Sequence, residues 1–224
     1  HNVNFDVIKE INGSISSKYI SIDFLDITTT EQNYFRLSYQ HSFEQVRESF
    51  LLVDTLAIPE GKYYDGQWQI SISSDNSRPI TYELEWLKGD YFLGKVDYRA
   101  FNISTNINRF VKMSFDLATR KIIFPENQFT IKSASFKLDL AFSPSLFWNN
   151  WFQYNNVSNE LSVFSRLVWQ QSPLNAFNLV INQSYIDNSA FDENQPTGTH
   201  FLGQSRFEKQ QQDIILKMSY LWRF

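Results

Sequence analysis

Apolar and polar residues alternate along most of this chain with a period of two, the spacing of side chains on the two faces of a β-strand. The C-terminal segment shows the pattern most clearly. One of its faces carries Ile214, Leu216, Met218, Tyr220, Trp222 and Phe224. The other face carries Lys217, Ser219 and Arg223, with Ile215 and Leu221 as apolar exceptions. Apolar residues rarely recur at helical spacing for more than two turns, so the pattern predicts an all-β protein.

This alternation, with the turn-forming residues between its runs, predicts about twelve strands. Their approximate ranges are 3–10, 15–27, 33–47, 62–74, 79–88, 91–104, 108–119, 129–142, 145–156, 160–171, 175–186 and 210–224. Every second connection is a turn, at 28–32, 75–78, 105–107, 143–145 and 172–174. The remaining connections include long segments at 48–61, 120–128 and 187–209, and a short one at 88–90. Such a chain is expected to form an antiparallel meander with its long loops at one edge.

Composition adds a membrane environment to this picture. Aromatic residues make up 17% of the 224 residues, although the mean hydropathy is negative, at -0.36. A transmembrane barrel combines these properties, because only alternate residues of each strand face lipid. No run approaches the roughly 20 apolar residues of a membrane helix. The sequence therefore predicts an antiparallel transmembrane β-barrel, with about 12 strands in this chain.

A soluble β-sandwich or small barrel is the alternative, and it would turn the apolar faces inward. About twelve strands, each with four or five large apolar side chains, would overfill one such interior. Aromatic residues also gather near the predicted strand ends, as in the girdles that membrane barrels place at the lipid interface. The tryptophans expected in this girdle are Trp68, Trp86, Trp148, Trp151, Trp169 and Trp222.

The C-terminus resembles the signal read by the machinery that assembles barrels in bacterial outer membranes. A terminal Phe is preceded by an apolar or aromatic residue at every second position. The matching residues are Leu216, Met218, Tyr220, Trp222 and Phe224. The resemblance implies a bacterial outer-membrane location, with outer-membrane lipid and lipopolysaccharide as surroundings and the barrel-assembly machinery as a partner during insertion. Phe224 would then lie at the periplasmic end and the 187–209 loop outside the cell.

The stretch from about 43 to 224 also resembles one family of uncharacterised Gram-negative outer-membrane proteins, whose barrel is a domain of unknown function. The resembling segments are Arg47–Phe50, Ile58–Tyr63, Tyr64–Gly66, Ser73–Arg78, Leu138–Phe147, Gln153–Asn155, Asn159–Ser162 and Leu216–Phe224. Members carry a carbohydrate-binding-module-like domain before the barrel. The resemblance implies that residues 1–224 are the C-terminal part of a longer protein, and it implies no catalytic residues. The chain begins at His1 and shows no signal peptide, so an export signal is expected to have been removed or the chain to be a fragment.

Charged residues on the polar faces of the predicted strands suggest a mixed-charge lumen. The lumen-facing candidates are Arg36, Glu83, Glu85, Lys95, Asp97, Arg99, Lys112, Asp116, Lys137, Asp139 and Arg166. Glu83 and Glu85 share a strand face at roughly 7 Å, a spacing that a glycosidase could use. Carboxylates on a lumen wall more often face water and tune ion selectivity.

Other chemistry has little support in the sequence. His41 lies across the pleat from Ser38 and Ser42, the wrong geometry for a Ser–His proton relay. No metal site, cofactor site or catalytic residue is predicted, since the chain has no cysteine and three scattered histidines. A net charge of -4 and the absence of a basic patch argue against nucleic acid.

Three functions are left by these observations. The first is a porin-like channel or a transport-related barrel, which the mixed-charge lumen favours. The second is a non-conducting membrane anchor or a partner subunit of an envelope complex, which the implied missing domain favours. The third and weakest is a barrel hydrolase acting on lipid or glycan. The twelve strands either close alone or form part of a larger barrel, because any even number suffices.

Overall fold

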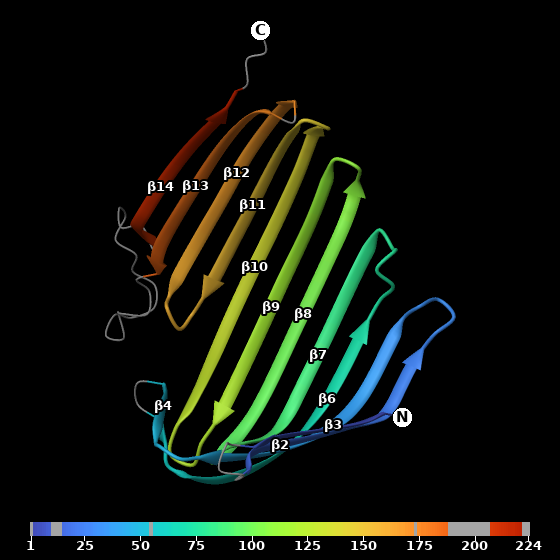
Figure 1. Ribbon diagram of the computed structural model, residues 1–224, viewed down its shortest axis with the longest axis vertical. Coiled ribbons are helices and arrows are strands. Elements are labelled where there is room, and N and C mark those ends of the chain that lie inside the picture. Colours follow the sequence, from blue (N-terminus) through green and yellow to red (C-terminus); the bar gives the residue numbers. More distant parts are fainter. Residues whose placement is uncertain (1, 10–14, 54–55, 173, 188–206, 221–224) are drawn as a thin grey trace, which may run out of the picture. The chain divides into compact units, whose positions relative to one another are not determined.

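In a computed structural model the chain forms one antiparallel sheet of twelve strands and a separate two-stranded hairpin (Figure 1). The structure describes residues 2–9, 15–53, 56–172, 174–187 and 207–220. The strands are β1 Val3–Lys9, β2 Ile15–Thr28, β3 Tyr34–Val46, β4 Phe50–Val53, β5 Leu56–Ile58, β6 Gly61–Ser73, β7 Ile80–Tyr91, β8 Gly94–Asn108, β9 Val111–Ile123, β10 Gln128–Ser143, β11 Leu146–Asn155, β12 Glu160–Ser172, β13 Asn175–Asp187 and β14 Phe207–Ser219. Across the described ranges, no helix is long and apolar enough to cross a membrane.

Neighbours in the large sheet are also neighbours in the chain. The hydrogen-bonded order is β1-β2-β3-β6-β7-β8-β9-β10-β11-β12-β13-β14. Only the β4–β5 hairpin, inserted between β3 and β6, interrupts the succession. The order is an open series, with β1 at one end and β14 at the other, so the expected closure into a barrel is not part of this structure.

All twelve predicted strands are present, with shifted ends. Residues 105–107, predicted as a turn, lie within β8, and the chain reverses at 109–110 instead. Residues 88–90 lie within β7, and 120–123 belong to β9, so these two connections shrink to 92–93 and 124–127. The strands extend through these segments because the alternation of apolar and polar residues continues past the turn-forming residues. Of the predicted 187–209 loop, residues 188–206 lie outside the described residues, whereas Asp187 ends β13 and Phe207–Lys209 begin β14.

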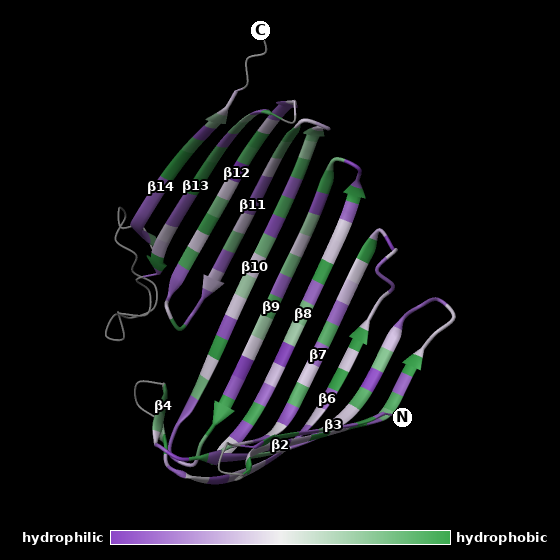
Figure 2. Cartoon of the chain, in the orientation of Figure 1, coloured by the Kyte–Doolittle hydropathy of each residue, from purple (hydrophilic) through white to green (hydrophobic). Residues whose placement is uncertain are grey.

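The alternation of the sequence is visible on the strands themselves. In Figure 2 hydrophilic and hydrophobic residues follow one another in bands along most of them.

The residues of the sheet belong to two compact units. Unit 1 comprises 1–101 and 118–130, and unit 2 comprises 102–117 and 131–224, so the division crosses β8, β9 and β10.

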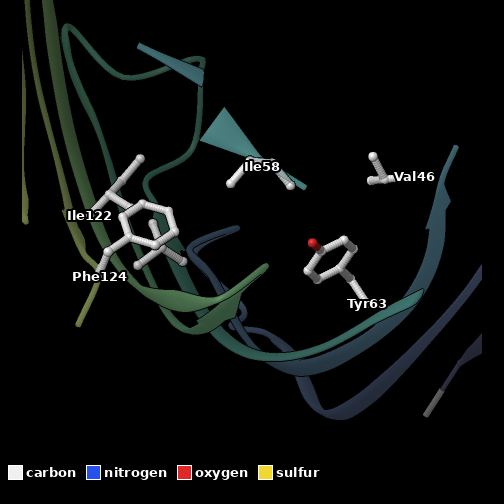
Figure 3. Close-up of a cluster of buried hydrophobic side chains, with 6 residues drawn as sticks. Val46, Ile58, Tyr63, Ile122 and Phe124 are labelled. Atoms are coloured by element: carbon white, nitrogen blue, oxygen red, sulfur yellow. The ribbon is translucent and has the colours of Figure 1, made fainter. Parts of the chain in front are cut away.

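Unit 1 contains the apolar cluster of the described chain. Its members are Val46, Ile58, Tyr63, Val96, Ile122 and Phe124. Ile58, at the end of β5, is fully buried, and Figure 3 shows it between the side chains of Tyr63 and Val46 and those of Ile122 and Phe124. The β4–β5 hairpin therefore packs against residues of the large sheet through its own apolar side chains.

Candidate functional site

Strand pairing in unit 1 separates a polar face from an apolar face. On the apolar face Leu37 pairs with Ile70, and Tyr39 with Trp68. On the polar face Ser38 pairs with Gln69, and Ser71 with Glu85. Because side chains alternate in a strand, each pairing fixes the face of every other residue on its strands.

Hydrogen bonds run across the polar face of unit 1 from strand to strand. The Arg36 guanidinium donates to Asp23 Oδ1 from Nε at 2.9 Å and from a terminal nitrogen at 2.8 Å, and the Asp23 side chain is only 3% exposed. Gln40 donates to Gln69, which donates in turn to Glu85 Oε1 at 2.7 Å. These bonds satisfy polar groups that alternate with apolar ones along the same strands, so the polar face is a connected surface rather than scattered charges.

Lys95, Asp97 and Arg99 do not join this polar face, so they and the pair Glu83 and Glu85 cannot all face one lumen as predicted. Trp86, on the apolar face opposite Ile70, donates from Nε1 to Asp97 at 3.1 Å. Val96 instead packs in the apolar cluster with Tyr63, which lies on the polar face opposite Glu44. A shift of one residue moves every side chain of a strand to the other face. Val96 and Tyr98 therefore lie on the same face as Tyr63, where Val96 is buried in the apolar cluster and Tyr98 packs against it.

The β4–β5 hairpin covers one end of this polar face, a feature that sequence reasoning missed. Tyr63 donates its hydroxyl to the Pro59 carbonyl at 2.7 Å, which ties the end of the hairpin to β6. Phe92 meets Phe50 and Tyr63 edge-on, with ring centroids 5.9 Å and 5.2 Å apart. The signal that could have revealed it is the run Phe50–Val53, four apolar residues in a segment that otherwise reads as a loop.

Unit 2 has its own polar face, rich in side-chain hydrogen bonds. Asp116 accepts from Asn102 and, at 2.7 Å, from the Ser135 hydroxyl. Asn149 donates to Asp139 at 2.8 Å, and Arg166 donates to Asn178 at 3.1 Å. Strand pairing puts Lys137 on the same face, two residues from Asp139, so the predicted polar positions of β9, β10 and β12 do share one face in this unit.

Trp151 lies on this polar face and not with the aromatic residues of the opposite face. It pairs with Lys137 on one side and Phe164 on the other, and the Lys137 ammonium lies 5.1 Å from its ring centroid. The predictions of Trp151 for the girdle and of Lys137 for the lumen are therefore incompatible, since both side chains share a face. Trp151 lies three positions after Trp148 on β11, so the two side chains point to opposite faces of the strand, and the girdle prediction did not take this into account.

A groove of about 320 Å³ adjoins Trp151 on this face. Its lining includes Gln153, Ser162, Phe164, Asn182, Ser184, Gln211 and Asp213, together with Trp151 and Glu160. Amide, hydroxyl and carboxylate groups beside two aromatic rings can bind polar solutes by hydrogen bonds and by ring contacts.

The other predicted tryptophans lie on apolar faces where the structure describes them. Trp68 and Trp86 belong to the apolar face of unit 1, and Trp148 and Trp169 pair with Leu167 and Leu146 on the apolar face of unit 2. Of the terminal signal, Leu216 and Met218 pair with Leu179 and Phe177 on that face. Tyr220 follows β14, while Trp222 and Phe224 lie outside the described residues.

The fold does not bring His41 together with Ser38 or Ser42, as a Ser–His proton relay would need. His41 pairs with Gly66 on the apolar face and stacks on Tyr64, while Ser38 and Ser42 lie on the opposite face. Within the described ranges, no three His, Cys, Asp or Glu side chains gather where they could hold a metal ion.

Comparison with family models, with curated proteins and with solved structures found no match for this chain.

Proposed function

We propose that this chain is a transmembrane β-barrel of the bacterial outer membrane, with its polar faces around a water-filled interior and its apolar faces against lipid. The observation that carries the proposal is the exposure of large apolar side chains on whole strand faces. Phe5, Ile214 and Met218, for example, are 61%, 60% and 71% exposed. Contiguous apolar surface of this extent is costly in water, whereas hydrocarbon accepts it without cost. On the opposite faces polar side chains hydrogen-bond to one another, as Gln69 does to Glu85 and Ser135 to Asp116, and a hydrated interior accommodates such groups.

Spin labels on β10 test the orientation of the faces. The chain has no cysteine, so a single Cys at 137 or 138 carries the label. In lipid vesicles, a label at Leu138→Cys should collide more often with oxygen, which concentrates in hydrocarbon. A label at Lys137→Cys should collide more often with a water-soluble nickel chelate. Equal accessibility at the two positions would contradict the proposal.

A role in transport is the function that we propose for this barrel. Its support is the hydrogen-bonded polar face of unit 2, with the groove beside Trp151 as a contact point for polar solutes. The full protein, inserted into a planar bilayer, should show discrete conductance steps, and Asp116→Asn with Asp139→Asn should lower its preference for cations. An inserted protein without conductance steps would sink the transport role while leaving the membrane location intact.

The apolar cluster favours a second candidate, a non-conducting anchor or a partner subunit of an envelope complex. Ile58 and Tyr63 place apolar bulk over the polar face of unit 1, where water would otherwise lie. Replacing 50–58 with a short Gly-Ser linker distinguishes the candidates. A channel narrowed by the hairpin should conduct more after the replacement, whereas an anchor should remain closed.

The resemblance to the uncharacterised outer-membrane family extends the proposal to the complete protein. In that reading residues 1–224 are the C-terminal part of the barrel, and further strands precede β1. The barrel-assembly machinery would then insert the chain from its terminal strand, reading Leu216, Met218 and the aromatic positions that follow. Deleting the last residue, Phe224, should slow insertion in cells more than it slows refolding into pure lipid vesicles.

A further inference from the structure

The apolar face of unit 1 changes character along β2, β3 and β6. One cross-strand row on this face is Ile22, Tyr39 and Trp68. The next row has His41 beside Ile20, and the row after it has Lys18 opposite Phe43. One pair further along, Lys62 lies opposite Gln45. The face thus passes from aliphatic and aromatic side chains to two lysines within a few residues.

Lysines on a lipid-facing surface need a reason. A charged side chain within hydrocarbon costs several kcal/mol, and the cost falls towards zero at the headgroup level. Lys18 and Lys62 are both exposed, and among the described residues neither forms an ion pair, whereas Lys95 on the same face is paired with Asp90. Two unneutralised ammonium groups beyond an aromatic row are suited to anionic groups at the membrane surface.

The two lysines flank one groove. Strands lie about 4.8 Å apart, so β2 and β6, on either side of β3, are about 10 Å apart. Lysine side chains are long enough to reach towards each other over Phe43 from that separation. The groove between them has a volume of about 620 Å³ and is lined by Ile20, His41, Phe43 and Tyr64 as well as by Lys18 and Lys62. Its apolar floor and cationic rim match an amphiphile that carries phosphate where its acyl chains begin.

We propose that this groove binds the phosphorylated headgroup of lipopolysaccharide, the glycolipid of the outer leaflet, with Lys18 and Lys62 on its phosphates. The inference rests on the proposed membrane function and adds a specific lipid site to it. The orientation agrees with the proposed barrel, because the groove lies at the strand ends that adjoin the β4–β5 hairpin, within the 47–60 connection, the longest of unit 1. Long connections lie outside the cell in such barrels, so this end would meet the outer leaflet. Lys18 and Lys62 supply the charge, while Phe43 and Tyr64 contact the sugar and the first acyl carbons.

Binding of bisphosphorylated lipid A to the full chain in phosphatidylcholine nanodiscs tests the proposal. Native mass spectrometry counts the lipid molecules retained as their concentration rises. Lys18→Gln with Lys62→Gln should weaken retention roughly thirtyfold, because each lysine near a membrane surface strengthens binding of an anionic lipid about fivefold. Lys18→Arg with Lys62→Arg should keep the affinity, since the charge is retained.

A matched control removes the same charge from the polar faces, through Lys112→Gln with Lys217→Gln, and should leave lipid A retention unchanged. Equal weakening by the control pair would overturn the site, because only net charge would then matter. So would equal retention of dephosphorylated lipid A, equal retention of phosphatidylglycerol, or displacement by millimolar inorganic phosphate. Failure of the proposed membrane function looks different, since the unmodified chain would not enter nanodiscs at all.

Discussion

Phe92 has a backbone φ of 50°, a left-handed conformation that a bulky side chain rarely adopts. The residue lies in the two-residue turn between β7 and β8, where glycine or asparagine is the usual choice. Its ring contacts Phe50, Tyr63 and Tyr91, so contacts with the hairpin and with β6 offset the strain. A turn residue chosen for its ring rather than its backbone indicates that holding the hairpin matters at this position.

Phe92→Gly should therefore relax the turn and loosen the hairpin at once. We expect faster hydrogen exchange at the β4 amides of 50–53, with little change at β7 and β8 amides away from the turn. Leu93→Gly is the control, because Leu93 is half exposed and has no comparable ring contacts. Unchanged exchange in β4 would mean that the hairpin is held by Ile58 alone.

Burial also decides how much the ion pair between Asp23 and Arg36 contributes to the free energy of unfolding. Asp23→Ala removes a buried acceptor of two guanidinium bonds and should lower the free energy of unfolding by about 1.5–3 kcal/mol. Glu31→Ala breaks the exposed pair with Arg78 and should cost at most about 1 kcal/mol. Urea unfolding of the vesicle-refolded chain measures both, and equal costs would contradict the ranking.

Asp75, in the turn between β6 and β7, offers a pH-dependent check. A hydrogen bond from the Ser77 backbone N–H, at 2.8 Å, lowers the pKa of its carboxyl below the usual value. A lowered pKa in the folded state means that the turn is stabilised above the ordinary carboxyl pKa and loses that contribution as the pH falls through the folded value. NMR titration should show the Asp75 carboxyl titrating below the ordinary aspartate value, and a midpoint at or above that value would contradict the assignment.

At the scale of elements, alternation predicted the existence of twelve strands but not always their facing. The 95–100 segment has the same apolar and polar rhythm as its neighbours, yet Val96 points into the apolar cluster and Asp97 does not face Glu85. Periodicity shows that the two faces of a strand differ in polarity, but it does not show which neighbours each face meets. A sheet that carries an apolar cluster against its polar face has two apolar environments. The hairpin and the groove at Trp151 escaped prediction for the same reason, since each depends on which strands become neighbours.

Close approach of β6 and β7 makes another element-scale prediction. A Cβ at Gly89 would lie 2.1 Å from the Gly66 carbonyl oxygen and 2.6 Å from Gln67 Cα, both backbone atoms. Gly89→Ala should force these strands apart and lower stability by about 1–3 kcal/mol. Gly61→Ala is the matched control, because its Cβ would meet only the Tyr63 ring at 3.5 Å. A thermal melt in detergent distinguishes them, and similar melting temperatures would refute the close approach.

At the scale of the whole molecule, the edge strands β1 and β14 decide whether the sheet can lie in a membrane without unpaired backbone groups. β1 and β14 each have one hydrogen-bonded neighbour among the described strands, and an unpaired edge in a membrane leaves backbone groups without partners. We expect β14 amides to be protected from exchange in lipid even though the sheet order leaves one edge open. Rapid exchange along 210–216 in vesicles would contradict a membrane-embedded barrel.

Crosslinking then identifies the covering strand. Cysteine pairs that combine 4, 5 or 6 with 212, 214 or 215 should form disulfides if the chain closes on itself. If the longer protein supplies further strands, these pairs should stay reduced in the complete protein, and cysteines in the preceding segment should react with β14 instead.

The meander order of the sheet also bears on how quickly the protein can form. Most hydrogen-bonded strands are separated by a turn of a few residues, so each pairing closes a short loop at small entropic cost. Pairs close to a turn can therefore form early, whereas pairs far from the turn join residues that are distant in the chain and form later. The exceptions are β3 and β6, joined through 47–60, and the last pair, β13 and β14, joined through the longer segment 188–206. The final strand is thus the slowest to find its neighbour unaided, and shortening 188–206 should accelerate the last kinetic phase of refolding into vesicles.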